Sequence, residues 1–176
     1  MNKEDFLDKL LLSYERSFDI CRPYNFAEES YDAFGEFNVI SAKYVLSKKA
    51  ELWRANCYEY VFFKLTDTFD LALAENFQNQ ITGHIEPELV RKGEVCPPPN
   101  HMYSFVTGIF ICESITAEAE KFIKNYKYIK NYRMTIRGYC EARLLIFDIK
   151  NQQIYGNRAA KDLIKGYKKI FQSYSR

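Results

Sequence analysis

The sequence predicts an α/β (α+β) fold, a mixed β-sheet flanked by helices, in one domain of 176 residues. Segments rich in Val, Ile, Tyr and Phe alternate along the chain with segments whose apolar residues recur at helical spacing. The composition, 47% hydrophobic and 16% aromatic, suits a core that folds without a disulfide or a metal. We expect an N-terminal helix in residues 1–22, a sheet-containing core in 36–149 and a C-terminal helix in 157–173.

The N-terminal third predicts one helix followed by paired strands. Residues 4–19 carry apolar side chains at helical spacing, and Pro23 ends the pattern because the residue before a proline disfavours the helical conformation. An acidic connector at residues 28–32 leads into residues 36–65, whose composition predicts two or three antiparallel strands with a turn at 47–49. Within them, we expect AELWRANCYEYVFFKL to form the edge of a hydrophobic sheet, with three core side chains: Trp53, Val61 and Phe63.

The middle of the chain predicts helices and then a buried strand. A helix over residues 69–81 is expected to end at Gly83, and a short helical piece with Pro87 near its start is expected to end at Gly93. Three consecutive prolines then fix an extended connector that runs to a loop containing His101. The nearly continuous apolar run at residues 103–114 predicts a strand covered on both faces.

The last third predicts a crossover and a terminal helix. Thr116 is the expected N-cap of a helix over residues 117–127, and strand character resumes at residues 140–149. Strand, helix and strand in this order predict a βαβ unit within the mixed sheet. A short strand follows, and Asn157 is the expected cap of the final helix.

The sequence lacks the residue patterns that disulfide bonds, metal sites and membrane spans require. The five cysteines form no CxxC pair and are expected to be free thiols in a reducing compartment. The two histidines, His84 and His101, have no partner at metal-ligand spacing, so no metal site and no cofactor is predicted. No apolar run is long enough to span a bilayer, and we expect a cytoplasmic protein without a membrane contact.

Charge is distributed unequally along the chain. Residues 1–112 carry 11 Lys and Arg against 17 Asp and Glu, a net charge of −6, whereas residues 113–176 carry 14 against 6, a net charge of +8. A basic half is typical of a protein with an anionic partner, and it also fits a contact between the two halves, within one chain or between two. The residues predicted to contact nucleic acid are Lys121, Lys124, Lys127, Lys130, Lys165 and Lys168, with Lys161 and Lys169 beside them; a solvated helix face is the alternative.

A buried strand that ends in small polar residues and is followed by a helix is expected at residues 107–126, TGIFICESITAEAEKFIKNY. This segment resembles the corresponding part of restriction-endonuclease-like domains of the Mrr type, and the order of elements before it is also similar. The resemblance covers residues 36–149 and implies a degenerate core of that fold. The chain is also similar to uncharacterised bacterial domain families, which implies no activity.

In the restriction-endonuclease-like family, an acid on one strand and a (D/E)xK motif on the next hold a divalent metal such as Mg²⁺. The resemblance makes Glu51, Glu59 and Lys64 the candidate catalytic residues. Valine stands where the motif after Glu59 needs lysine, and strand alternation puts Lys64 on the face opposite Glu59. The alternative for Glu59 is a structural ion pair across the sheet with Arg54 or Arg143.

The sequence therefore predicts a non-catalytic binding or interaction module that contacts an anionic partner through its basic C-terminal half. Three classes of partner remain open: nucleic acid, an acidic protein and a second copy of the chain. The alternative function is a metal-dependent nuclease whose catalytic lysine has moved.

Overall fold

The computed structural model describes residues 2–44 and 51–174, with side chains at residues 2–40 and 55–171. The strands of its main sheet are β1 (Asp19–Cys21), β4 (Ala33–Tyr44), β5 (Glu51–Leu65), β7 (His101–Cys112), β9 (Ile129–Asn131), β10 (Tyr139–Asp148) and β11 (Gln153–Gly156). The described helices are α1 (Lys3–Tyr14), α2 (Leu71–Gln80), the π-helix η1 (Ile81–Val90), α3 (Ala117–Asn125), the 3₁₀-helix η2 (Arg158–Ala160) and α4 (Lys161–Tyr174).

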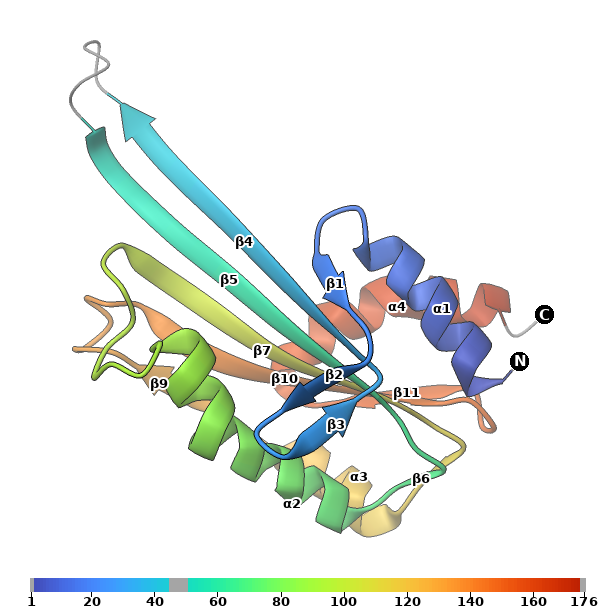
Figure 1. The fold of residues 1–176 in the computed structure, drawn as a ribbon. Coiled ribbons are helices and arrows are strands. Elements are labelled where there is room, and N and C mark those ends of the chain that lie inside the picture. Colours follow the sequence, from blue (N-terminus) through green and yellow to red (C-terminus); the bar gives the residue numbers. More distant parts are fainter. Residues whose placement is uncertain (1, 45–50, 175–176) are drawn as a thin grey trace.

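These strands form one mixed sheet in the order β1-β4-β5-β7-β10-β11, and β9 also pairs with β10 (Figure 1). β5, β7 and β10 are parallel to one another, whereas β4, β9 and β11 are antiparallel to the strands beside them. The parallel pair β7 and β10 is connected through α3, which confirms the predicted βαβ unit. The α/β class expected from the sequence is confirmed.

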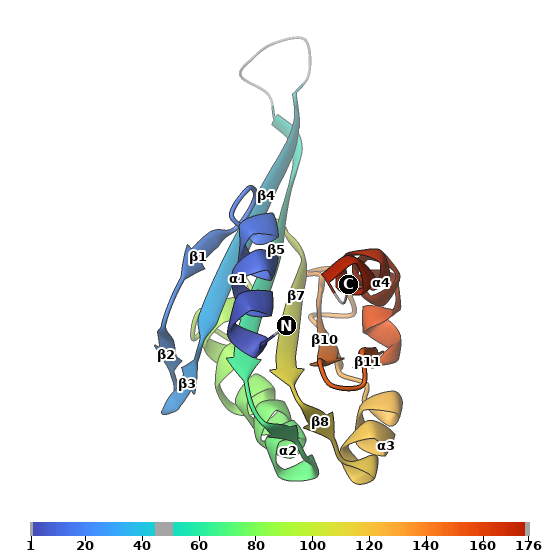
Figure 2. The same cartoon turned by 90° about the vertical axis from the view of Figure 1, so that its right-hand side faces the viewer.

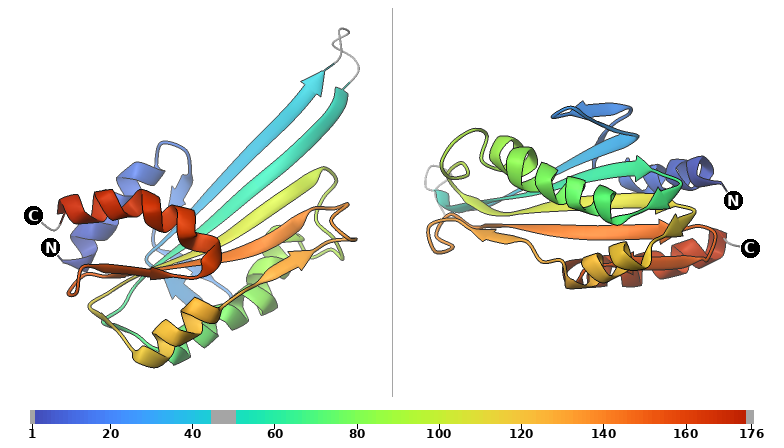
Figure 3. Two further views of the ribbon diagram at one scale, coloured as in Figure 1. Left: turned by 180° about the vertical axis from the view of Figure 1, so that it is seen from behind. Right: turned by 90° about the horizontal axis from the view of Figure 1, so that it is seen from below.

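Side chains of the central strands point alternately to the two faces of the sheet, and a separate hydrophobic core lies on each face. On one face, Phe62 of β5 packs with Phe77 of α2 and Phe110 of β7, and η1, α3 and a small hairpin complete this layer. On the other face, Val61 and Phe63 of β5 pack with α1 and α4. Helices therefore flank both faces of the sheet, as the views from the side and from below show (Figures 2 and 3).

The two helices on the second face cover only one end of the sheet. Figure 3 (left) shows α1 and α4 side by side over the ends of the strands near β11, while the other end of β5, β7 and β10 has no helix over it. The hydroxyl groups of Tyr14 of α1 and Tyr167 of α4 form a hydrogen bond with each other, so the two helices are in direct contact. None of the helices that the structure describes combines the length and the apolar character needed to span a bilayer.

The N-terminal segment differs from its prediction in two places. The helix expected over residues 4–19 ends at Tyr14, because its carbonyl accepts hydrogen bonds from the backbone N–H groups of Ser17 and Phe18, and the chain then enters β1. The expected acidic connector is a hairpin of β2 (Tyr24–Phe26) and β3 (Glu29–Tyr31). Its two turn residues, Ala27 and Glu28, both have positive φ angles of 47° and 67°, as a type I′ turn requires.

Two further expectations for the middle of the chain are wrong. β5 lies between β4 and β7, so it is a central strand and not an edge. Gly83 does not end a helix, because α2 continues directly into η1, which ends after Val90.

Two more short strands, β6 (Thr68–Phe69) and β8 (Ser114–Ile115), pair with each other. The predicted turn at residues 47–49 and the predicted burial of Trp53 lie outside the described residues and side chains.

Candidate anion-binding surface

Two adjoining hollows lie where the end of α3 meets the start of α4. The first, of about 580 Å³, is bordered by the connector from α3 to β9 and by Asn157 and Arg158. The second, of about 420 Å³, continues along α4. Six cations line the two hollows, and we call them the basic surface: Lys124, Lys127, Arg158, Lys161, Lys165 and Lys168.

The first segment of the basic surface follows from the capping of α3. Thr116 caps the helix as predicted, since its hydroxyl accepts a hydrogen bond from the backbone N–H of Ala119. The last residue of the helix is Asn125, and the residue after it, Tyr126, has an extended backbone and a ring buried against the sheet. The chain then runs straight into β9, so Lys124 and Lys127 lie on either side of this helix end.

Asn157 joins this segment to the start of α4. It is 2% exposed, and its side-chain oxygen accepts a hydrogen bond of 3.0 Å from the backbone N–H of Leu144. Its amide nitrogen donates to the carbonyl of Ala142 at 3.0 Å and to the carbonyl of Tyr126 at 3.4 Å. Asn157 occupies the N-cap position of η2, as predicted, but its side chain makes no capping hydrogen bond and instead bridges β10 and the end of α3. This bridge brings Arg158 next to the α3–β9 connector.

The charge of the basic surface is only partly neutralised. Lys124 pairs with Glu120 and Lys165 pairs with Asp162 along their own helices, and Glu141 lines the first hollow. Four exposed cations form no ion pair with any described carboxylate: Lys127, Arg158, Lys161 and Lys168. A concentration of unpaired positive charge around a hollow attracts phosphate groups.

The fold brings together four of the six lysines predicted to contact nucleic acid: Lys124, Lys127, Lys165 and Lys168. Lys121 is exposed on α3 but lines neither hollow. Lys130 pairs with Glu86 at 2.8 Å, on the face of the sheet that carries η1. Sequence reasoning missed Arg158. The signal that could have found it is its place directly after Asn157, at the start of the last helix.

The carboxylate that holds Lys130 belongs to a buried cluster that the sequence did not predict. Glu86 of η1 is fully buried and also accepts hydrogen bonds from Arg91 at 2.8 Å and from Tyr132 at 2.6 Å. Burial acts to raise the pKa of Glu86, but the hydrogen bonds from Lys130, Tyr132 and Arg91 outweigh it and hold that pKa below its usual value. Two cations share this one carboxylate, so each charged group of the cluster has a partner, and the contacts join η1 to β9.

The structure separates the three candidate catalytic residues. Lys64 pairs with Glu29 at 2.8 Å on the face covered by α2, whereas Glu59 lies on the opposite face, as strand alternation predicts. The side chain of Glu51 lies outside the described side chains. Over the described parts of the chain, no group of three or more His, Cys, Asp or Glu side chains is arranged to hold a metal ion.

Glu59 instead forms the predicted type of contact across the sheet. One of its oxygens accepts a hydrogen bond of 2.9 Å from Thr107 and lies 3.8 Å from a guanidinium nitrogen of Arg143. Burial raises the pKa of Glu59, and the Thr107 hydroxyl and the Arg143 charge offset only part of that effect. Of the two arginines considered from the sequence, Arg143 is the one that the described contacts show.

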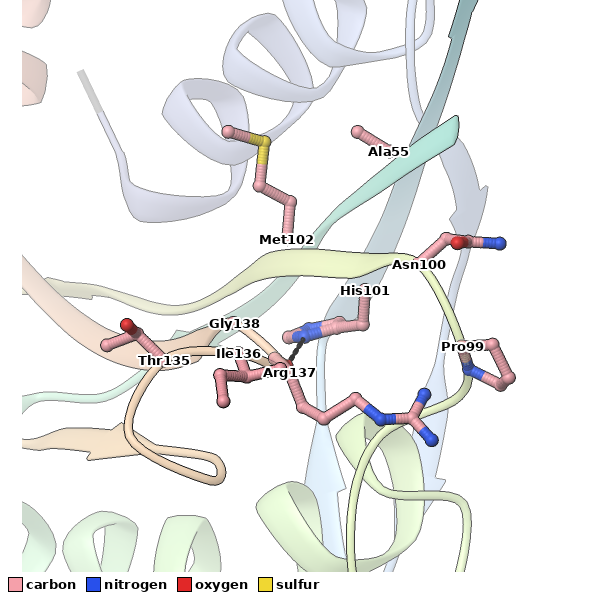
Figure 4. A pocket seen from close by; sticks show the side chains of 9 residues that line it. All are labelled: Ala55, Pro99, Asn100, His101, Met102, Thr135, Ile136, Arg137 and Gly138. Carbon is pink, nitrogen blue, oxygen red and sulfur yellow. Dashed lines mark hydrogen bonds between the residues drawn. The ribbon is translucent and has the colours of Figure 1, made fainter. Parts of the chain in front are cut away.

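A third hollow, of about 490 Å³, opens beside the start of β7 and includes His101 (Figure 4). His101 is 5% exposed, so its expected place in a polar loop is wrong. Its Nδ1 contacts the carbonyl of Arg137 at 2.9 Å and its Nε2 contacts the hydroxyl of Ser104 at 2.8 Å. Burial lowers the pKa of His101, and both ring nitrogens have partners, so this imidazole has a structural role. Met102 projects to the opposite side of β7.

The fold and the basic surface define a mixed α/β domain with a cationic edge beside its sheet. The chain belongs to the family described as a domain of unknown function (DUF8052), whose model matches residues 2–169. No curated protein and no solved structure matches the chain. None of these comparisons shows a likeness to restriction-endonuclease-like domains, so the resemblance noted at residues 107–126 finds no support in them.

Proposed function

We propose that this protein is a non-catalytic binding module that contacts the phosphate backbone of a nucleic acid through its basic surface. One observation carries the proposal. Two segments about thirty residues apart in the sequence converge on adjoining hollows lined by six cations and one carboxylate, Glu141. Several cations held on one surface suit a ligand with regularly spaced negative charges, because each phosphate contact releases condensed counterions.

The electrostatics of Glu59 support the non-catalytic part of the proposal. Its nearest charged group is the Arg143 guanidinium, and Lys64 is engaged with Glu29 on the other face. The nuclease alternative needs carboxylates that converge on a metal and a lysine beside them. Proteins that bind a nucleic acid without reacting with it need no such arrangement.

Fluorescence anisotropy with labelled oligonucleotides, measured over a series of salt concentrations, tests the proposal. We expect binding that weakens steeply with salt and that falls further in a variant with two charge reversals, Lys127→Glu and Arg158→Glu. The matched control reverses the same amount of charge elsewhere, at the exposed Lys92 and Lys150. Equal losses in the two variants, or no binding by the wild type, would overturn the proposal.

A further inference from the structure

Three aromatic side chains near the starts of β7 and β10 form a cluster, Tyr103, Phe105 and Tyr139. The ribbon shows that α1 and α4 do not cover this end of the two strands (Figure 3, left). The ring of Tyr103 lies 4.7 Å from that of Phe105 and 6.1 Å from that of Tyr139, between ring centroids. All three side chains are half-buried, and none of them belongs to either of the two cores. We call this group, on neighbouring strands β7 and β10, the aromatic face.

Strand register explains why these rings share one side of the sheet. Tyr103 is the cross-strand neighbour of Tyr139, and Phe105 is the neighbour of Glu59, which lies on the α1 and α4 side. Further apolar side chains close by are exposed, Ile129 by 44% and Met102 by 55%. Apolar side chains gathered on an uncovered part of a sheet are typical of a surface that binds a partner.

The aromatic face is continuous with the basic surface. Glu141 is the neighbour of Phe105 on one side and of Ile129 on the other, and both Glu141 and Ile129 line the first hollow together with Lys127 and Arg158. Adjacent strands lie about 4.8 Å apart, so a chain of a few nucleotides reaches from the cations to the rings.

The charges on the aromatic face determine how such a ligand would lie. Glu141 places a carboxylate beside Phe105, which disfavours phosphate there, while the cations are gathered at the edge. Carboxylate oxygens accept hydrogen bonds from the amino groups of bases. The guanidinium of Arg143 lies 3.2 Å above the centre of the Phe105 ring, and its buried Nε has no hydrogen-bond partner in the described structure. The guanidinium therefore covers one side of the Phe105 ring, which leaves Tyr103 and Tyr139 as the rings for stacking.

We propose that the aromatic face stacks the bases of a single-stranded nucleic acid whose phosphates lie on the basic surface. The inference rests on the proposed function and narrows its ligand to single strands, because the bases of a duplex are stacked on one another and cannot lie on protein rings. Stacking on Tyr103 and Tyr139 needs no particular base, so the expected binding is tolerant of sequence.

The test compares a single-stranded oligonucleotide with a duplex of the same sequence. We expect tighter binding of the single strand, and we expect Tyr103→Leu and Tyr139→Leu each to weaken it by about tenfold without changing duplex binding. Leucine keeps apolar bulk but cannot stack. Tyr139→Trp should retain the affinity, and the control Tyr155→Leu removes a half-buried ring from the opposite face. Thermal unfolding identifies any variant that fails to fold.

The outcomes separate the two proposals. Equal affinity for single strand and duplex, with no effect of the leucine variants, would overturn the stacking inference and leave backbone binding intact. Absence of binding to either oligonucleotide would overturn both. A dimer that forms with rising concentration and is lost in Tyr139→Leu, with oligonucleotide binding unchanged, would assign the aromatic face to a second copy of the chain and would also overturn the inference.

Discussion

Replacing Asn157 by alanine removes the side chain that joins the two halves of the basic surface. The variant loses three hydrogen bonds and leaves the N–H of Leu144 and the carbonyl of Ala142 without the partner that Asn157 supplied. A buried polar group left without a partner costs about 1–3 kcal/mol. Because the side chain of Asn157 is only 2% exposed, we expect a loss of about 2–4 kcal/mol in the free energy of unfolding.

Urea unfolding at neutral pH measures this loss directly, and a thermal scan should show a midpoint lower by about 5–15 °C for a chain of this length. The matched control is Asn125→Ala. Asn125 is exposed, and its one hydrogen bond goes to the carbonyl of Lys121 in its own helix, so we expect a change within about 0.5 kcal/mol. The reasoning is refuted if Asn157→Ala destabilises the protein no more than this control does.

Three further predictions concern the buried carboxylates and metal ions. The pKa of Glu86 is lowered in the folded state, so its stabilisation is fully present above the unfolded value of about 4.3 and is lost as the pH falls through the lower folded value. Glu86→Gln should therefore be clearly less stable than the wild type at pH 7, and the difference should narrow as the pH falls below about 4.3. A difference in urea unfolding that stays constant with pH would contradict this. The pKa of Glu59 is raised in the folded state, so the stability that Glu59 contributes to the wild type is lost as the pH rises from about 4.3 through the folded pKa. Glu59→Gln should remove this pH dependence and should be at least as stable as the wild type at pH 7. A variant that is less stable at pH 7 by more than about 1 kcal/mol would disprove the prediction. Mg²⁺ or Mn²⁺ should leave the melting temperature unchanged, whereas a rise that Glu59→Ala abolishes would favour the nuclease alternative.

The sequence predicted those parts of the fold that depend on local periodicity. Strand alternation separates Glu59 from Lys64 whatever the rest of the chain does, and the structure agrees. The buried strand at β7 and the capping of α3 by Thr116 are also local signals, and both were predicted correctly. Four of the six predicted lysines meet because α3 and α4 begin and end close to where their apolar patterns indicate.

Contacts between distant residues could not be predicted in this way. Glu86 and Lys130 are 44 residues apart, and nothing near either residue indicates the other. Asn157 has the sequence context of a helix cap, but its side chain finds stronger buried partners on β10. The hairpin turn at Ala27 and Glu28 uses residues that seldom adopt positive φ, so its sequence carries no turn signal.

The central claim is that the α3–β9 connector and the start of α4 act as one phosphate-binding surface, and the salt dependence of binding tests it most directly. The slope of log affinity against log salt concentration counts the phosphates neutralised, at about 0.7 for each contact with a single strand. Alanine at both Lys127 and Arg158 should therefore reduce the slope by about 1.4 relative to the wild type, while alanine at both Lys92 and Lys150 should leave it unchanged. An identical slope in the wild type and the Lys127 and Arg158 variant would contradict the claim.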